Sequence, residues 1–399
     1  MLPAMPIWSE PATLVEGAAA LAAVPSTDLT RRPGGRGLVA DPDRFDPAWP
    51  AMAAWAAAGV PGGIPADPPL RAFVRPGPVE ELQAALDAAA AAGGGTVLLA
   101  PGTHLVERTL RIPSGVLLRG VWADQVWLEG RMRHGFAGWG SNPGIPARGA
   151  VVVMEDATGA GLAHLTVTYD RTLPPPPQLR RGDPGFADRP GGRDDLFVMG
   201  LRLARCTGCW TEGCRFFDCG TNPVEVGFSR HCTVRCCEIS GSHNQGGGQG
   251  YVHCGRSESC LFADLVVRDC RHLTIQESSP EHPCRWNVVI GCDLAVDVNF
   301  HSGDGGANLV QDCRIHCPSW HWWGPFAIGV KGQHRPPGPG NALFRNDAVR
   351  WFGAGMERDR PTPRTDVVYT MADDWSKPTV RPLGPAPVHG TLYAVRPAT

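Results

Sequence analysis

The chain has 399 residues, 43% of them hydrophobic, with 50 glycines, 39 prolines and a net charge of −2. This glycine and proline content gives too many turns for a helical protein, and the near-neutral charge excludes a strong overall attraction to nucleic acid or to an anionic membrane. The segment 1–26 lacks a basic stretch followed by a continuous apolar run, and no membrane-spanning stretch follows it, so we expect a cytoplasmic protein.

The first 71 residues are rich in alanine, proline and glycine and show no sustained period. They predict an irregular extension that packs on the outside of the main domain. From Val79 to Ala92 the residues follow an amphipathic helical pattern, and Gly93 to Gly95 end the predicted helix. Three short strands are expected next, separated by Pro-Gly and Pro-Ser-Gly turns.

Similar short segments recur along the second half of the chain. They align Cys214, Cys237, Cys270, Cys292 and Cys313, which lie 23, 33, 22 and 21 residues apart. Apolar runs precede these cysteines, and a second strand-like run follows each of them. Short strands that recur at such a period predict a solenoid in which each coil buries its apolar side against the next. The longer interval predicts an insertion.

Residues 93–104 read GGGTVLLAPGTH and lead from the predicted helix into the first coils. With these features the chain resembles the pectate-lyase-like superfamily over residues 72–355. The resemblance implies an all-β fold, a right-handed parallel β-helix with an N-terminal capping helix and long loop insertions, with residues 356–399 as a C-terminal cap. The superfamily includes lyases, hydrolases, epimerases and phage tailspikes, so the resemblance leaves the activity open.

All fourteen cysteines lie between Cys206 and Cys317. An even number of cysteines is compatible with disulfides, but the aligned ones stand where other coils carry valine or leucine. Because a buried free cysteine behaves as a small hydrophobe, we expect these thiols to stack as a ladder inside the solenoid. The alternative is structural zinc at the CxxC motif of Cys206 and Cys209.

Three polar, proline- or glycine-rich insertions interrupt the coils, at Arg171–Asp195, Ser240–Gly250 and Gly332–Asn341. We expect all three to emerge on one side of the solenoid and to wall a cleft. The first is either a mobile surface loop or a lid over that cleft.

Polar residues that alternate with apolar ones in a strand face away from the core. The outward set predicted in this way is Glu225, Tyr251, His253, Thr274, Gln276, Asp297, Asn299, His301, Lys331 and Gln333. Because adjacent coils lie about 4.8 Å apart, we expect His253, Gln276, Asp297 or Asn299, and Lys331 to form a polar ladder.

Lys331 is one of only two lysines among 37 basic residues. A lysine can act as a base when its surroundings lower its pKa, which arginine does not do. A solvated charge or a pair with Asp297 is the alternative. His253 or His301 is the candidate acid, and His334 and Arg335 border the predicted cleft.

Trp320, Trp322 and Trp323 precede the Lys331 strand and could stack on sugar rings, or pack over the end of a coil. Asp304 stands in a glycine-rich turn. If calcium is used, Asp297 and Asp304 are its candidate ligands.

These residues support three functional hypotheses. The leading one is a polysaccharide lyase that cleaves a uronate-containing glycan by β-elimination, with Lys331 as the base and Arg335 or a cation neutralising the carboxylate. The second is a glycoside hydrolase or intramolecular glycosyl transferase that uses Asp297 with Asp304 or Glu277. The third is a glycan-binding β-helix without turnover. The expected partner in each is a carbohydrate.

Overall fold

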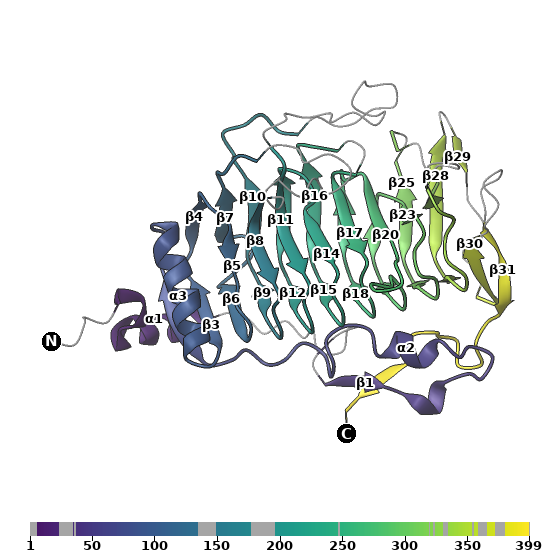
Figure 1. The fold of residues 1–399 in the computed structure, drawn as a ribbon, viewed down its shortest axis with the longest axis horizontal. Helices are drawn as coiled ribbons and strands as arrows, with labels where there is room; N and C mark the ends of the chain where they lie inside the picture. Colours follow the sequence, from purple (N-terminus) through teal and green to yellow (C-terminus); the bar gives the residue numbers. More distant parts are fainter. Residues whose placement is uncertain are drawn as a thin grey trace.

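The computed structural model describes residues 6–23, 35, 37–134, 149–176, 196–245, 248–318, 320–321, 324–329, 334–352, 355–357, 365–371 and 380–398. Three sheets of mostly parallel strands run along the molecule, and the chain passes from one sheet to the next in every coil (Figure 1). The predicted fold class, a right-handed parallel β-helix, is confirmed. No helix in the described ranges is long and apolar enough to cross a membrane.

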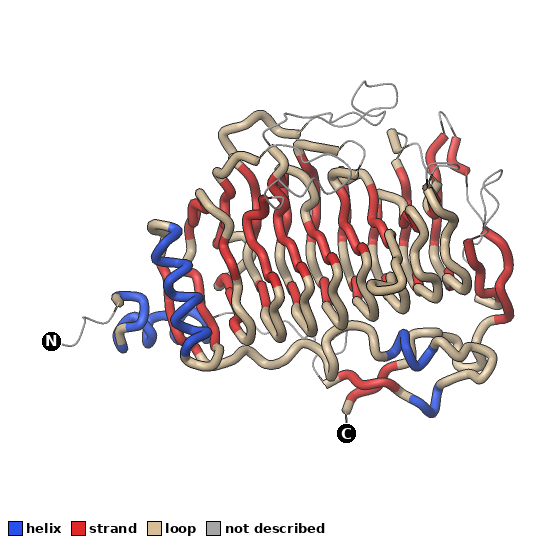
Figure 2. The backbone as a smooth tube through the Cα atoms, viewed as in Figure 1, coloured by secondary structure: helices blue, strands red, loops and turns tan. Residues whose placement is uncertain are grey.

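Each coil contributes one strand to each sheet, in the order sheet C, sheet D, sheet B (Figure 2). Sheet C contains β4 (Gly102–Val106), β7 (Val126–Gly130), β10 (Thr166–Tyr169), β13 (Arg215–Cys219), β16 (Glu238–Ser242), β19 (Val266–Arg268), β22 (Asp293–Leu294), β25 (Arg314–Cys317), β28 (Asp347–Phe352) and the antiparallel β29 (Gly355–Glu357). Sheet D contains β5 (Leu110–Arg111), β8 (Gly149–Glu155), β11 (Val198–Ala204), β14 (Val224–Gly227), β17 (Tyr251–Gly255), β20 (His272–Gln276), β23 (Val298–His301) and β26 (Phe326–Ile328).

Sheet B contains β2 (Leu70–Val74), β3 (Gly95–Leu99), β6 (Val116–Gly120), β9 (Gly161–Ala163), β12 (Trp210–Glu212), β15 (Thr233–Arg235), β18 (Leu261–Ala263), β21 (Val288–Ile290), β24 (Leu309–Gln311), β27 (Ala342–Phe344), β30 (Val367–Met371) and β31 (Val380–Pro385). Alternate residues of all three sheets point inward and form one buried cluster that follows the axis of the solenoid. In sheet D, for example, Val226, Cys254, Ile275 and Phe300 are level with one another and buried.

All fourteen cysteines are free thiols, and all but Cys236 are buried. The single ladder of five aligned cysteines predicted from sequence is wrong in one position. The strand register places Leu265, not Cys270, between Cys237 and Cys292. Cys270 follows β19, one sheet connection further along the coil. A leucine can occupy this position because the position requires only a buried apolar side chain. An alignment based on cysteines alone therefore assigns the repeat of this coil to the wrong residue.

Burial raises the pKa of Cys214 to about 11 and that of Cys270 to about 12, so these thiols stay protonated.

A second ladder lies at the start of the sheet B strands and changes its chemistry along the axis. Cys209, Cys232 and Cys260 are followed on the next coils by Asn287, Asn308 and Asn341. The three asparagines bond to one another: the backbone N–H and the side-chain amide of Asn287 donate to Asn308 Oδ1, at 2.9 and 3.1 Å. Asn308 bonds to Asn341 in the same way. The side-chain amides thus provide hydrogen-bond partners for buried backbone N–H groups at the turn between sheets D and B.

Both ends of the solenoid are covered. The predicted helix forms as α3 (Val79–Ala91), and its buried face joins the main core at the first coils. At the other end β30 pairs antiparallel with β31 and closes sheet B, within the predicted C-terminal cap. Such a hairpin protects the last parallel strand from pairing with another molecule.

The N-terminal extension is more regular than predicted. It contains α1 (Pro11–Ala22), α2 (Met52–Ala56), two short 3-10 turns (Ile7–Ser9 and Pro42–Arg44) and β1 (Leu38–Ala40), and β1 pairs with β32 (Val395–Pro397) near the C-terminus. Trp55 of α2 packs against Leu261, Val288 and Leu309 on the outside of sheet B. The extension therefore covers the outer face of sheet B.

The insertions flank sheet D on two edges instead of emerging on one side. Arg171–Asp195 and Ser240–Gly250 lie between sheets C and D, whereas Gly332–Asn341 lies between sheets D and B. The prediction that three loops wall one side is therefore wrong. Residues 177–195 lie outside the described part of the chain, so the lid remains a prediction.

Candidate functional site

The outward face of sheet D carries the predicted polar residues, but in a different register. His253 is level with Glu225 on one side and with Thr274 on the other, and Asn299 follows on the next coil. Gln276 is level with His301. Asp297 is level with His272, whose neighbour Leu273 donates its N–H to the Asp297 carbonyl. The single ladder predicted from sequence is therefore three parallel rows.

Most of this face is covered, and several of its polar atoms have no partner. Five side-chain atoms are buried without a hydrogen bond to any described residue: Thr274 Oγ1, Gln276 Oε1, Asp297 Oδ2, Asn299 Oδ1 and His301 Nδ1. All five lie on β20 and β23 or one residue before β23. Buried polar atoms are nearly always satisfied, so this group of five makes the outward face of sheet D a candidate for contact with a ligand or an ion.

Glu225 and His253 form the middle row. Glu225 Oε2 lies 3.8 Å from His253 Nδ1 and accepts a hydrogen bond from Asn222 at 3.2 Å. Arg202 lies 3.4 Å from the other carboxylate oxygen. The carboxylate is thus fixed, and its negative charge lies close to the imidazole, although 3.8 Å is too long for a hydrogen bond. Gly255 leaves the room for that ring, because a Cβ there would lie 2.6 Å from His253 Cε1.

A second cluster lies at the start of the strands, beneath the connection between sheets C and D. Asp297 Oδ1 lies 2.6 Å from His272 Nδ1 and 3.1 Å from His321 Nε2. The side chains of Asp297 and His321 are fully buried and that of His272 is 4% exposed. His321 Nε2 also donates to the carbonyl of Arg271 at 2.9 Å, while Arg271 Nε donates to His272 Nε2 at 3.4 Å.

The charges in this cluster are set by burial and by contact. Burial lowers the pKa of His272 to about 4, so this imidazole is neutral. Burial alone would raise the pKa of Asp297, yet the two imidazoles hold it at about 2. Burial likewise opposes the charge on His321, but Cys317 and Asp297 hold its pKa well above the usual value. An ionised carboxylate therefore lies between a neutral and a protonated imidazole.

Two further histidines contact each other, His301 at the end of β23 and His334 in the segment that follows β26. The rings of His301 and His334 are 3.9 Å apart between centroids, and Gly329 permits this contact because a Cβ there would meet His334 at 2.7 Å. Burial, with His334 as the next cause, lowers the pKa of His301 to about 3. His301 is therefore unprotonated at neutral pH and is not available as the general acid that the sequence suggested.

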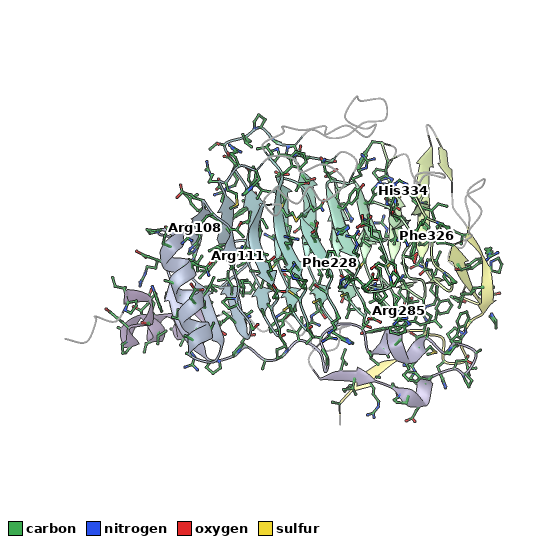
Figure 3. The ribbon with its side chains drawn as sticks, viewed as in Figure 1. Arg108, Arg111, Phe228, Arg285, Phe326 and His334 are labelled. Carbon is green, nitrogen blue, oxygen red and sulfur yellow. The ribbon has the colours of Figure 1, made fainter. Side chains whose placement is uncertain are left out.

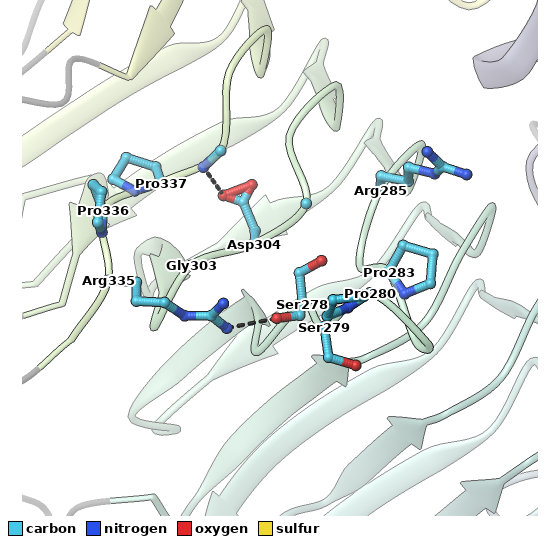
Figure 4. A pocket seen from close by; sticks show the side chains of 12 residues that line it. Ser278, Ser279, Pro280, Pro283, Arg285, Gly303, Asp304, Arg335, Pro336 and Pro337 are labelled. Carbon is cyan, nitrogen blue, oxygen red and sulfur yellow. Dashed lines mark hydrogen bonds between the residues drawn. The ribbon is translucent and has the colours of Figure 1, made fainter.

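An open pocket of about 600 Å3 lies at the edge between sheets D and B, and Arg335, which follows His334 in the chain, lines it. Figure 3 shows His334, Phe326 and Arg285 in the C-terminal half of the solenoid, and Figure 4 shows the pocket from close by. Arg335 crosses it and donates to the carbonyls of Ser278 and Ser302. No carboxylate of the described chain pairs with Arg335, so the pocket presents a positive charge to an incoming group.

Asp304 also lines the pocket, but its oxygens are already used. They accept hydrogen bonds from Gly306 N, Gly338 N, Asn308 Nδ2 and Asn341 Nδ2. These bonds hold two connections between sheets D and B together. As a calcium ligand Asp304 would have to give up these amide donors, so the calcium prediction through Asp304 does not fit the structure. Asp297 faces two imidazoles, and calcium prefers oxygen ligands.

The remaining predicted residues fall into three groups. Lys331, Trp322 and Trp323 lie outside the described residues, so their roles remain predictions. Trp320 packs edge-on against His321 at 5.4 Å, and the Tyr251 hydroxyl accepts a bond from Gly248 N. These two residues hold connections in place. Glu277, a carboxylate of the hydrolase hypothesis, pairs with Arg256 at 3.1 Å.

Sequence reasoning missed His272, His321 and Arg271. His272 is the first residue of β20, and its side chain points outward because those of Leu273 and Ile275 point inward. Extending the alternation of inward and outward residues by one position toward the N-terminus would have identified it. His321 lies in an irregular connection, where no period predicts direction.

Comparison with known proteins supplies little beyond the fold. No protein-family model and no curated protein matches the chain. Among solved structures, the ORF18 protein of Geobacillus virus E2 is similar at 10% identity with a TM-score of 0.40, covering 80% of this chain and 75% of its own. A pectin methylesterase of Erwinia chrysanthemi matches at 13% identity and 0.37, covering 70% and 86%. An exopolygalacturonase of Thermotoga maritima matches at 12% and 0.36, covering 72% and 82%.

Proposed function

We propose that the chain is a carbohydrate-active enzyme whose site lies where sheet D meets the pocket of Arg335. The observation that carries this proposal is a group of four unsatisfied buried polar atoms on β20 and β23, namely Thr274 Oγ1, Gln276 Oε1, Asn299 Oδ1 and His301 Nδ1, on strands whose ends lead toward a pocket of about 600 Å3. Amide, hydroxyl and imidazole groups in such a row suit the many hydroxyls of a sugar. A pectin methylesterase and an exopolygalacturonase are among the solved structures with weak similarity to this chain.

The reaction we propose is β-elimination on a uronate-containing glycan. Arg335 provides a cation for the uronate carboxylate, and neutralising that carboxylate makes the neighbouring carbon–hydrogen bond more acidic. His253, whose Nδ1 lies 3.8 Å from the Glu225 carboxylate, donates a proton to the leaving oxygen, since His301 is unprotonated. The base is Lys331, as the sequence suggested. The hydroxyls of the sugar bond to Gln276 and Asn299.

The hydrolase hypothesis has less support. Asp297 is fully buried between two histidines, Asp304 is held by amides, and Glu277 is paired with Arg256. None of the three carboxylates of this hypothesis is therefore free to flank a glycosidic bond.

The test is a panel of uronate-containing polysaccharides and oligosaccharides, with absorbance of the unsaturated product in the near ultraviolet as the readout. We expect one substrate class to yield this product and His253→Gln to lower the turnover rate by about 100-fold or more. His316→Gln is the matched control, because His316 also contacts a carboxylate, Asp347 at 2.8 Å, but on sheet C.

Three outcomes decide between the hypotheses. New reducing ends without absorbance would identify a hydrolase and contradict elimination. Glycan binding without either product, retained in His253→Gln, would identify a binding protein. An equal loss of turnover rate in His253→Gln and His316→Gln would contradict the placement of the active site on sheet D.

A further inference from the structure

We propose that His272, Asp297 and His321 bind a transition-metal ion that links three consecutive parts of the solenoid. The proposal is independent of the reaction above. It rests on three potential ligand atoms that lie within 4.8 Å of one another and are buried together. Each comes from a different coil element: β20, the residue before β23, and the connection before β26.

The distances fit an ion after small movements. Two ligands that each lie about 2.1 Å from one ion are about 3 to 3.5 Å apart. The present separations from Asp297 Oδ1 are 2.6 Å to His272 Nδ1 and 3.1 Å to His321 Nε2. The two histidines therefore need to move apart from the carboxylate by less than about 1 Å each.

An unsatisfied atom points to the same place. Asp297 Oδ2 has no hydrogen-bond partner among the described residues, although Asp297 is 0% exposed. An ionised carboxylate without a partner for one oxygen is costly in a buried site. A cation bound by this carboxylate would remove that deficit.

The surrounding groups specify the kind of metal. Two imidazoles and one carboxylate suit zinc and its first-row neighbours better than calcium or magnesium, which prefer oxygen ligands. The carbonyl of Arg271, 2.9 Å from His321 Nε2, adds a fourth potential ligand at the same side of the ring. The guanidinium of Arg271 next to His272 opposes a cation, so we expect the affinity to be moderate.

The role of the ion would be structural. The three ligands are buried, and the ion would fix the connection that carries Trp320 and His321 onto sheet D. Metal binding to a folded site raises the stability of the fold. We therefore expect the thermal midpoint of the chelator-treated chain to rise when zinc is added.

The experiment uses the full chain, stripped with a chelator and titrated with cobalt(II) and zinc. We expect one ion per chain, cobalt bands in the visible region, and an X-ray absorption spectrum of the zinc form with nitrogen and oxygen neighbours and no sulfur. The absence of sulfur separates this site from the fourteen cysteines. His321→Ala and Asp297→Asn should weaken binding by about 100-fold or more, while His316→Ala should bind as the wild type does.

Several results would overturn the proposal. A stripped wild-type chain that binds no stoichiometric ion would do so, as would thiolate charge-transfer bands or sulfur neighbours. Equal loss in His316→Ala would also contradict it. If the two site variants fail to fold, the X-ray absorption spectrum of the wild type alone still decides between imidazole and thiolate ligands.

Discussion

Gly255 shows at the scale of one residue how the backbone positions the candidate acid. We expect Gly255→Ala to displace the His253 ring, which a Cβ would approach to 2.6 Å, and to lower kcat/KM by about 10- to 100-fold. Gly227→Ala is the matched control. Gly227 is level with Gly255 on the preceding strand, and the nearest atom to a Cβ there is Glu225 Oε1 at 3.9 Å. Steady-state kinetics of both variants on the identified glycan would test this, and equal losses would contradict it.

His301 makes the stability of the protein depend on pH. Its pKa in the folded chain is about 3, below the ordinary value of 6.5. The unfolded chain therefore binds more protons between these values, and stability falls as the pH is lowered through this window. The charged and titratable groups that act on it are His334, His272, Asp297 and Arg271.

We expect the wild type to lose more stability than His301→Gln when the pH falls from 7 to 4, with a slope difference of up to about 1.4 kcal/mol per pH unit. Urea unfolding at several pH values measures this difference. Parallel pH profiles for the two chains would show that His301 does not carry the effect.

The residues of the candidate site were predictable to the extent that strand alternation sets direction. Glu225, His253, Gln276, Asn299 and His301 face outward because their neighbours are apolar and buried. Which of them stand level depends on strand register, and a shift of two residues keeps the face while changing every neighbour. The contact between His272 and His321 joins a strand to an irregular connection. No local sequence pattern predicts that these two residues lie close together.

At the scale of the structural element, the asparagine ladder holds the turn between sheets D and B. Asn308 is fully buried and accepts two hydrogen bonds from Asn287. Asn308→Ala leaves the backbone N–H of Asn287 without an acceptor and removes the side-chain donor to Asn341 Oδ1, so we expect a loss of about 3 kcal/mol in unfolding free energy. Cys232→Ala, at the same place in an earlier coil, removes only a thiol and should lose about 1 kcal/mol. Urea unfolding of the two variants compares them, and equal losses would mean that the amide bonds add nothing.

The repeat itself was readable because each coil must bury one apolar side, which forces a period on the sequence. The misplacement of Cys270 has the same origin. Leu265 fills the buried position as well as a cysteine does. The sequence period therefore reflects which positions are buried and not the recurrence of one residue type. The helix α1 was missed because its alanines and glycine give a weak amphipathic pattern that tertiary contacts complete.

At the scale of the whole molecule, the N-terminal extension seals sheet B. Trp55 is 1% exposed, and its indole N–H donates to the carbonyl of Ala307 at 2.7 Å. We expect Trp55→Ala to lower the unfolding free energy by about 3 to 5 kcal/mol, as is typical for a buried tryptophan. Trp127→Ala, at a partly exposed position on sheet C, should have a smaller effect. Thermal unfolding measures both, and a larger effect at Trp127 would contradict the role assigned to the extension.

The antiparallel pair of β1 and β32 has a mechanical consequence. Leu38 is opposite Pro397 and Ala40 is opposite Val395, so residues 37 and 398 leave the pair on the same side. A force that pulls these two residues apart would break the backbone hydrogen bonds of the pair one after another. The pair would therefore separate at a lower force than one whose ends leave on opposite sides and whose hydrogen bonds must break together.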